Sequence, residues 1–351
     1  MTVMPYTFHK LASRASNYYR YCLIISLSFG LSFSAYGAQP IEFKGNKSLP
    51  VCVYIASYAP GYSWQDGIQQ GLTNTLKSHC KIKTFFMNSK KVTNKVDLKN
   101  IGLEAKKFIE TQSPKVVIVS DDNAVRYVLE PYYKDSAIPF VFCGVNHSGA
   151  HYGLPYKNTT GMVEKNPTES LFKLLFSIQP SKTHIAFLTT QGTSAAKDIA
   201  NFNQFKQKWS IEGSTFAIKT EQEWRRVYKQ LQEDPNVDII LFSNRAALKT
   251  WDHNKNLEWI KTHNHKISVT TQDFMMPYVA LGMNKIASEQ GTWSGEAAIA
   301  ILNGVAPGKI SVVPNQNFQL WINPEIAKPF KKLLPENTFS HALIYDSLGN
   351  K

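Results

Sequence analysis

The sequence predicts an α/β protein with two lobes, each a doubly wound parallel sheet, and several hinge crossings between them. Short apolar runs rich in Val, Ile and Phe alternate with amphipathic segments of helical period, and polar loops follow the runs. This unit recurs in both halves of the chain. About 310 residues follow an N-terminal leader, which is enough for two lobes of ordinary size.

The leader comprises residues 1–38 and has the three parts of a signal peptide. Basic residues precede an uncharged run from Tyr21 to Phe33, and Ala35-Tyr-Gly37 supplies the small residues that a signal peptidase reads. Cleavage is expected after Gly37 or Ala38, which would release the protein into the periplasm of a Gram-negative bacterium. An uncleaved membrane anchor is the alternative, but the run is short for a bilayer span and is interrupted by serine and glycine.

The first lobe is expected to comprise residues 46–147 and 279–308. Four apolar runs predict its strands: Val51–Ile55, Ile82–Met87, Val116–Val119 and Phe140–Cys143. Three amphipathic segments predict its helices: Gln65–Ser78, Leu98–Gln112 and Asn123–Tyr132. Residues 146–161 are rich in Gly, Asn and Thr and are expected to cross to the second lobe.

The second lobe is expected to comprise residues 160–275 and 312–342. Four runs predict its strands: His184–Leu188, Ser214–Ile218, Ile239–Phe242 and Ile267–Thr271. Three segments predict its helices: Ser194–Trp209, Glu221–Glu233 and Arg245–Asn254.

The pattern changes in the last quarter of the chain. Gly282–Asn303 is predicted to be one long helix, with a face of small residues that suits close packing on the first lobe, and Gly304 ends it. An extended return over Lys309–Trp321 and a last helix over Pro324–Leu334 are expected to follow. A chain that passes between the two lobes several times would let the lobes close about a hinge.

The number of cysteines and the distribution of charge narrow the possible classes of protein. Three cysteines follow the leader, too few for a disulfide framework. Cys52 and Cys80 lie at the starts of neighbouring strands, so a bridge between them is expected in an oxidising compartment, whereas Cys143 is expected to be a buried free thiol. The formal net charge of +13 is scattered along helical segments, and nucleic-acid binding requires a concentrated basic face instead.

Three aromatic residues follow the first predicted strand. Tyr58, Tyr62 and Trp64 lie where that strand ends and a helix begins, and the carboxyl edge of a parallel sheet is where such folds bind ligands. These side chains either meet a ligand or pack the loop onto the domain, since buried aromatics need only one polar partner each.

Two further loops of the first lobe carry polar groups to the same edge. Ser120 or Asp121 would contact an amine or a hydroxyl of a ligand. The competing interpretation for this loop is that Asp122 or Asn123 caps the following helix. Gly144 would let the backbone approach a ligand closely, with Asn146 beside it.

Polar groups also follow three runs of the second half. The residues at 190–194 offer amides and hydroxyls that could hold an anionic group ahead of a helix, or Ser194 simply caps that helix. The candidates in this half are Thr190, Gly192, Thr193, Ser194, Asn244 and Asp273.

Catalytic and metal-binding signatures are absent from the sequence. It contains no P-loop, no G-x-G-x-x-G, no G-x-S-x-G and no H-E-x-x-H. Its histidines lack a supporting cysteine or carboxylate pattern. We therefore expect no enzymatic activity, no cofactor and no metal.

With these loops in view, the chain resembles the ABC transporter substrate-binding proteins of the tryptophan/tyrosine type, which have the type I periplasmic binding fold. The resemblance spans roughly Val51–Pro335. Its most specific segments are Ser57-Tyr-Ala-Pro-Gly-Tyr-Ser-Trp64, Ser120-Asp121 with Ile138–Val145, and Gly295–Pro307. It implies a ligand in a cleft between the lobes, touched by Tyr58, Trp64, Ser120, Asp121, Gly144, Asn146, Thr190, Gly192 to Ser194, Asn244 and Asp273.

The chain departs from that family at one of these segments. Many relatives continue the Gly-Val motif with Asp-Pro, whereas here Asn146-His147-Ser148 follows Val145. Fold-level resemblance does not carry substrate identity, so the class of ligand does not follow from it.

The resemblance implies a monomeric periplasmic solute-binding protein. It would close on a small molecule, such as an amino acid or another aromatic or polar metabolite, and deliver it to an ABC permease. The alternative is a ligand-sensing periplasmic subunit that regulates a membrane sensor protein, because the same two-lobed clamp serves both. An exported hydrolase would need a convergent nucleophile and base, which the sequence does not show.

Overall fold

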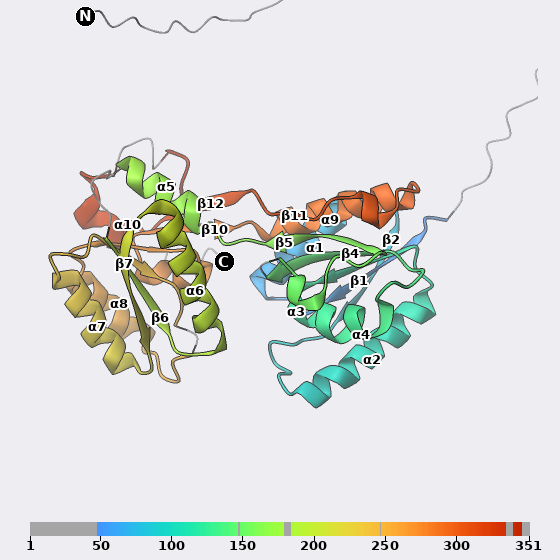
Figure 1. The fold of residues 1–351 in the computed structure, drawn as a ribbon, viewed down its shortest axis with the longest axis horizontal. Coiled ribbons are helices and arrows are strands. Elements are labelled where there is room, and N and C mark those ends of the chain that lie inside the picture. The colour runs from blue at the N-terminus through green and yellow to red at the C-terminus, as the bar shows by residue number, and fades with distance from the viewer. Residues whose placement is uncertain (1–47, 147, 179–183, 246, 335–339, 346–351) are drawn as a thin grey trace, which may run out of the picture. The chain divides into compact units, whose positions relative to one another are not determined.

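The computed structural model describes residues 48–146, 148–178, 184–245, 247–334 and 340–345, so the predicted signal peptide lies outside the described part. The described chain forms two sheets dominated by parallel strands and covered by helices (Figure 1), which confirms the predicted fold class. Within these residues, every helix is too short or too polar to cross a membrane.

The first sheet has the strand order β11-β5-β4-β3-β1-β2 and is parallel throughout. Its strands are β1 (Val51–Ala56), β2 (Lys81–Phe86), β3 (Val116–Ser120), β4 (Phe140–Asn146), β5 (Thr159–Glu164) and β11 (Val313–Pro314). Because β1 lies between β2 and β3, the connections from β1 and β3 leave toward opposite faces of the sheet. The crevice outside the carboxyl ends of these two strands is therefore the topological switch point.

Helices cover both faces of the first sheet (Figure 1). One face packs against α1 (Ser63–Leu76) and α9 (Ala287–Leu302), and the other against α2 (Lys95–Gln112), α3 (Asp121–Ala124), the π-helical turn η1 (Val125–Leu129) and α4 (Glu130–Tyr133). Alternate strand residues feed the two cores: Tyr54 and Ile118 face α1 and α9, while Val53 and Val117 face α2.

The predicted face of small residues lets α9 pack closely on α1. A Cβ atom on Gly71 would lie 2.3 Å from the Ser288 carbonyl oxygen, and one on Gly291 would lie 2.0 Å from that of Ile68. The two helices therefore meet backbone to backbone.

The second sheet has the strand order β13-β12-β10-β9-β8-β6-β7. Its strands are β6 (His184–Thr190), β7 (Glu212–Ile218), β8 (Ile239–Phe242), β9 (Ile267–Thr270), β10 (Leu281–Lys285), β12 (Phe318–Ile322) and β13 (Leu343–Ile344), and only β10 with β12 is antiparallel among the described pairs. Its helices include α5 (Thr168–Ile178), α6 (Thr193–Trp209), α7 (Glu221–Glu233) and α8 (His253–Thr262).

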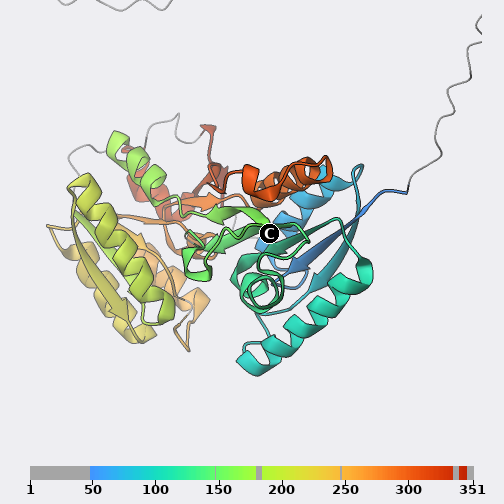
Figure 2. The same cartoon turned by 45° about the vertical axis from the view of Figure 1, so that its right-hand side comes forward.

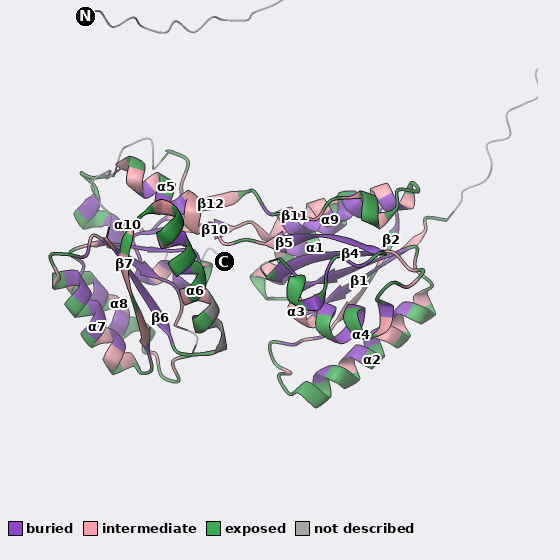
Figure 3. Ribbon diagram, viewed as in Figure 1, coloured by how far each residue is buried: buried purple, intermediate pink, exposed green. Residues whose placement is uncertain are grey.

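The helices of the second sheet also divide between its two faces (Figure 2). Phe187 of β6 stacks on Phe202 of α6 with ring centroids 4.9 Å apart. On the other face, Trp224 of α7 stacks on Phe242 of β8 at 5.4 Å. Figure 3 shows the strands between these helices as buried core. Short helical turns complete the fold: η2 (Ala150–Tyr152), η3 (Asp273–Tyr278), η4 (Pro307–Lys309), α10 (Pro324–Ala327) and η5 (Lys328–Phe330).

Two of the predicted helices are wrong. The first part of the predicted helix at 282–303 is strand β10, because it pairs along its whole length with β12, and the helix begins only at Ala287. The helix predicted over 245–254 instead runs over His253–Thr262. Asp252 caps it by accepting a hydrogen bond from the Lys255 amide at 3.1 Å, while Trp251 packs into the core against Trp224.

The division of the strands between the two sheets also differs from the predicted lobe boundaries. Residues 159–164 form β5 of the first sheet, so the chain does not cross over 146–161 but after Glu164; the β-branched run Thr159-Thr160 pairs with β4 in parallel. Conversely, β10 (281–285) belongs to the second sheet and β11 (313–314) to the first.

The described chain thus passes between the sheets three times, after β5, after β10 and after β11. The crossings are tied together: the Asn315 side chain accepts a hydrogen bond from the Lys165 amide at 2.7 Å, and Lys285 forms an ion pair with Glu164.

Cys52 and Cys80 form a disulfide with their Cα atoms 5.9 Å apart. The parallel register of β1 and β2 places Cys52 opposite Ile82, and Cys80 immediately precedes β2 at the same edge of the sheet. Cys143 is free and buried.

Candidate functional site

The loops after β1 and β3 are joined at the carboxyl edge of the first sheet. The hydroxyl of Ser57 donates to the carbonyl of Ser120 at 2.6 Å and accepts from the amide of Ala124 at 2.8 Å. Ser57 therefore accepts a hydrogen bond from a backbone amide that has no partner within the helical segment after β3, because the segment begins there. The predicted cap at Asp122 or Asn123 is wrong, because the helical segment begins at Asp121.

Asp121 is the most constrained side chain at this edge. It is 3 % exposed and has a left-handed backbone conformation, with φ of 66°. The indole Nε1 of Trp64 donates to its Oδ1 at 2.9 Å, and its Oδ2 is buried with no hydrogen-bond partner among the described residues. Burial raises the pKa of this carboxyl well above its usual range, and the negative charge of Glu164 raises it further.

Gly144 makes room for that carboxyl. Its φ is 64°, and a Cβ atom at this position would lie only 2.9 Å from Asp121 Oδ1. The pairing of β4 with β5 shifts register between Phe142 and Val145, so Gly144 sits in a bulge. Gln290 of α9 fixes the bulge by accepting a hydrogen bond from the Gly144 amide at 2.9 Å.

The aromatic residues of the first loop lie around Asp121. The rings of Tyr58 and Tyr62 meet edge to face with centroids 5.2 Å apart. The turn between them is fixed because the Gly61 amide donates to the carboxylate of Asp66 in α1 at 3.0 Å. Tyr62 remains 40 % exposed, and burial together with Asp273 and Asp121 raises its pKa to about 12.

Trp64 connects this loop to the crossings between the sheets. The ammonium of Lys285, at the end of β10, lies 5.2 Å from the centroid of the Trp64 ring. The same ammonium pairs with Glu164 at the end of β5, and both side chains are nearly buried. Trp64, which was predicted from the sequence, is therefore contacted by Lys285, and Glu164 holds that lysine; the sequence interpretation found neither of these two charged residues.

Asn146 lies at the rim of this edge and is held by Asp122. Its side-chain amide donates to Asp122 Oδ2, while the hydroxyl of Tyr152 donates to Asp122 Oδ1 at 2.8 Å. The imidazole Nε2 of His151 lies 3.6 Å from the same oxygen. Asp122 thus positions Asn146 and does not cap a helix.

The candidates of the second sheet also lie at carboxyl edges of strands. Thr190 ends β6 and is buried, Asn244 follows β8, and Asp273 begins η3, where its Oδ1 accepts from the Phe274 amide at 2.8 Å. Helix α6 begins at Thr193 with Gly192 as its N-cap residue, so Ser194 is inside the helix and is not its cap.

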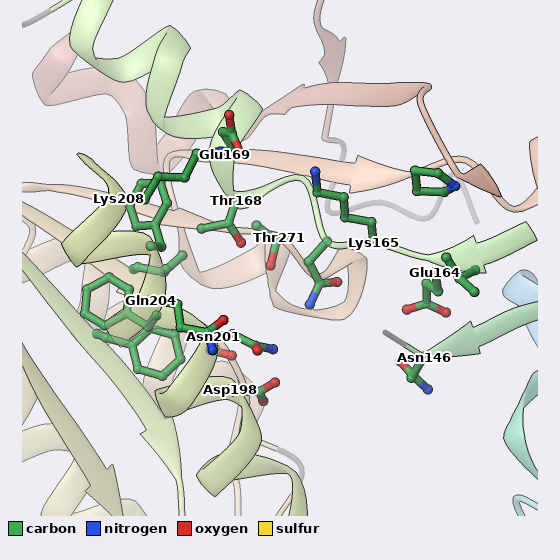
Figure 4. A pocket seen from close by; sticks show the side chains of 18 of the residues that line it. Asn146, Glu164, Lys165, Thr168, Glu169, Asp198, Asn201, Gln204, Lys208 and Thr271 are labelled. Carbon is green, nitrogen blue, oxygen red and sulfur yellow. Dashed lines mark hydrogen bonds and ion pairs between the residues drawn. The ribbon is translucent and has the colours of Figure 1, made fainter. Parts of the chain in front are cut away.

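A cavity of about 540 Å³ lies beside these loops (Figure 4). Asn146 and Glu164 of the first sheet line one side, and Asp198, Asn201 and Gln204 of α6 line the other. The apolar part of its wall is formed by the side chains of Phe187, Phe202, Phe205, Leu241 and Val163. Further polar lining comes from Ser148, Lys165, Asn166, Thr168, Glu169, Lys208, Ser243 and Thr271.

Of the predicted site residues whose side chains the structure describes, only Asn146 lines this cavity directly. The sequence did carry one signal for the wall formed by α6: Asp198, Asn201, Phe202 and Phe205 recur at helical spacing, so polar groups share a face with buried rings. The described residues contain no group of three or more His, Cys, Asp and Glu side chains that could hold a metal ion.

Two sheets dominated by parallel strands and joined by three crossings are the architecture of the type I periplasmic binding fold. The family model described as ABC transporter substrate binding protein matches residues 51–343. The chain therefore belongs to the family of ABC transporter substrate-binding proteins, as its sequence resemblance implied. No curated protein matches the chain in sequence.

Solved structures share the fold at low sequence identity. A domain from Streptococcus pneumoniae in complex with L-Trp is 17% identical, with a TM-score of 0.54, and the match covers 84% of this chain and all of that one (100%). A ligand-free, open substrate-binding protein with adhesive properties from Clostridium difficile is 13% identical, with a TM-score of 0.69 and coverages of 85% and 99%. A periplasmic ribose ABC transporter protein from Conexibacter woesei is 13% identical, with a TM-score of 0.51 and coverages of 81% and 95%.

Proposed function

We propose that this protein is an exported solute receptor that closes on a small polar or aromatic molecule, such as an amino acid, and delivers it to an ABC permease. One observation carries the proposal: side chains of both sheets line a single cavity of about 540 Å³, within the range of small-molecule sites. The chain acts as a monomer and without a metal or cofactor in this proposal.

The arrangement at the carboxyl edges supports a ligand contact by the predicted residues. Trp64 and Asp121 are joined by a hydrogen bond. Glu164 pairs with Lys285, whose ammonium lies over the Trp64 ring, and Glu164 also lines the cavity. Closure would move the second sheet about the three crossings and bring Thr190, Gly192–Ser194, Asn244 and Asp273 toward the ligand. The relative from Streptococcus pneumoniae, whose structure contains L-Trp, is consistent with an aromatic ligand but does not assign one here.

A thermal-shift screen of the purified protein against amino acids, nucleosides, sugars and small acids tests the proposal. A ligand that binds only the folded state at 100 times its Kd stabilises that state by about 2.7 kcal/mol, so a hit raises the melting temperature clearly. If no solute in the screen raises it, the receptor function is contradicted.

The role of the receptor is tested in cells. Deletion of the gene should abolish uptake of the labelled ligand if the protein serves a permease. Unchanged uptake with intact binding would contradict delivery and favour the alternative role in regulating a membrane sensor. Mass spectrometry of periplasmic protein should find an N-terminus near Ala38 or Gln39, and an intact Met1 on membrane-bound material would contradict export.

A further inference from the structure

Most of the net positive charge of the chain comes from one segment, residues 77–115. Residues 39–351 contain 36 Lys and Arg against 26 Asp and Glu, a formal excess of ten. The segment contains ten Lys, no Arg and three Asp or Glu, so it supplies seven of those ten charges. Nine of its lysines are exposed: Lys77, Lys81, Lys83, Lys90, Lys91, Lys95, Lys99, Lys107 and Lys115. The charge, expected from the sequence to be scattered, is therefore concentrated in β2, α2 and the loops beside them.

The fold does not neutralise these lysines. Among the described residues, the ion pair of this segment joins Lys106 to Glu110 within α2, and Lys106 is the one lysine of the ten that is not exposed. The nine exposed lysines have no carboxylate within ion-pair distance in the described part of the chain. This part of the surface therefore presents positive charge that an external anion could compensate.

The fold brings the lysines of β2 beside α2. β2 is the edge strand of the first sheet, and its Phe85 packs on Phe108 of α2 with ring centroids 5.6 Å apart. Lys81 and Lys83 share the strand face of Phe85, because side chains alternate along a strand, so they leave the sheet on the side that α2 covers. Lys115 directly precedes β3, at the amino edge of the sheet where Lys81 begins β2. The predicted ligand loops lie at the opposite, carboxyl edge.

Two apolar side chains stand among these charges on the outer face of α2. Val96 is 64 % exposed and Leu103 is 52 % exposed, which makes them the two most exposed large apolar side chains on the described helices. Leu103 follows Val96 by seven positions and Lys107 follows Leu103 by four, so the three share one line along the outside of the helix, and Lys99 flanks that line. Figure 3 shows α2 on the outside of its sheet. A cationic helix face with exposed apolar side chains is typical of helices that lie in a membrane interface.

The residue types favour a lipid surface over a specific anionic partner. Arginine, which recognises a phosphate or carboxylate through two parallel hydrogen bonds, is absent from residues 77–115. Lysine acts as a point charge and suits a diffuse anionic surface, where the number of charges matters more than their geometry. Val96 and Leu103 would gain nothing from a nucleic-acid backbone, but they would be removed from water among lipid headgroups.

We propose that the outer face of α2, together with the lysines of β2 beside it, binds an anionic phospholipid surface. Val96 and Leu103 insert among the headgroups, and the surrounding lysines contact the phosphates. None of these residues lines the cavity of the proposed receptor site. The membrane contact therefore leaves that cavity free and does not depend on which solute the protein binds.

Co-sedimentation of the purified protein with vesicles tests this contact. Vesicles of equal parts phosphatidylglycerol and phosphatidylcholine are compared with vesicles of phosphatidylcholine alone, at low and at high salt. We expect the anionic vesicles to bind the protein at least about tenfold more tightly, and added salt to weaken that binding, because salt screens exposed charges. Equal binding to both kinds of vesicle, or binding to neither, would overturn the proposal.

A triple variant tests whether the place of the charge matters or only its total. Replacing Lys81, Lys99 and Lys107 by Gln should weaken binding to the anionic vesicles roughly 100-fold, since each lysine near such a surface contributes about fivefold. The matched control removes the same number of charges from exposed lysines outside the segment that have no ion pair among the described residues. These control lysines are Lys219, Lys328 and Lys331. The control should bind as the parent does, and an equal loss in both variants would overturn the proposal, because net charge alone would then govern binding.

A second variant tests the apolar part of the contact. Val96→Ser combined with Leu103→Ser should weaken vesicle binding about tenfold, while an unchanged melting temperature shows that the fold is intact, because both side chains are exposed. Unchanged vesicle binding would overturn insertion among the headgroups. Binding of a labelled single-stranded DNA as tightly as the anionic vesicles, with no effect of the two serines, would also overturn the proposal in favour of a general polyanion surface. Solute binding in the thermal-shift screen is independent of each of these outcomes.

Discussion

Replacement of Gly144 by alanine tests how tightly the bulge of β4 and the buried carboxyl of Asp121 depend on each other. A non-glycine residue at φ of 64° costs about 1–2 kcal/mol. The alanine also restricts the unfolded chain, which returns about 0.4–1 kcal/mol. The added Cβ would lie 2.9 Å from Asp121 Oδ1, and such overpacking costs about 1–3 kcal/mol. The expected loss is therefore about 1–5 kcal/mol in the free energy of unfolding.

Gly153→Ala is the matched control for the backbone part of that loss. Its φ of 72° is similar, but its added Cβ would only meet Tyr156 Cε1 at an ordinary 3.7 Å, so we expect a loss of at most about 1.6 kcal/mol. Urea unfolding monitored by tryptophan fluorescence measures both variants, provided that the slope with denaturant is unchanged.

A double-mutant cycle then isolates the contact with Asp121. Asp121→Gly removes the carboxyl at a position whose own φ is 66°, so glycine is tolerated there. In that background Gly144→Ala should cost no more than Gly153→Ala does in the parent. Equal losses for Gly144→Ala in both backgrounds would refute the reasoning, because the cost would not come from Asp121.

Three further predictions concern the same region. Trp64→Ala should weaken ligand binding roughly tenfold to hundredfold by calorimetry, since loss of a stacking ring costs about 1–3 kcal/mol; an unchanged Kd in a folded variant would mean that the loop aromatics are packing only. Burial holds the folded pKa of Asp121 above its unfolded value of about 3.9, so this carboxyl lowers the stability of the folded protein as the pH rises above about 4. Asp121→Asn should therefore raise the urea midpoint at pH 7 and make the midpoint fall less steeply as the pH rises. The same dependence of the midpoint on pH in the variant and the parent would contradict this. Peptide mapping without reductant should recover Cys52 linked to Cys80 and Cys143 free, and three free thiols in oxidised material would contradict the pairing.

Most strands could be predicted because their hydrophobic patterns are local. Val116–Val119 and Ile239–Phe242 are continuous apolar runs; the first forms all but the last residue of buried strand β3, and the second is the whole of buried strand β8. The segment 281–285 was misassigned because its residues, Leu-Gly-Met-Asn-Lys, have no strong period of their own. Its strand depends on pairing with Phe318–Ile322, more than 30 residues away, and sequence pattern does not report such pairing.

The same limit explains which site residues could be found. Tyr58, Trp64 and Asp121 lie in the loops and helix starts that follow predicted strands, so the rule that ligands bind at carboxyl edges makes them candidates. Glu164 and Lys285 end β5 and β10, the two strands assigned to the wrong lobe or to a helix, so their approach to Trp64 could not be anticipated. The face of α6 that lines the cavity was assigned only as a helix, because its polar residues look like an ordinary exposed surface.

The first sheet holds its part of the proposed site in place through buried contacts that involve no ligand. The hydroxyl of Tyr54 lies 2.9 Å from that of Ser120 and accepts a hydrogen bond from Gln65 Nε2, also at 2.9 Å. Through Gln65 these bonds reach into α1, the helix that begins beside Trp64, and through Ser120 they reach the residue before Asp121. The indole and the carboxyl are thus fixed from both sides by fully buried groups, and their mutual hydrogen bond is formed without a ligand. In the proposed receptor, binding free energy that would otherwise order these side chains would then be available for closing the second sheet over the ligand.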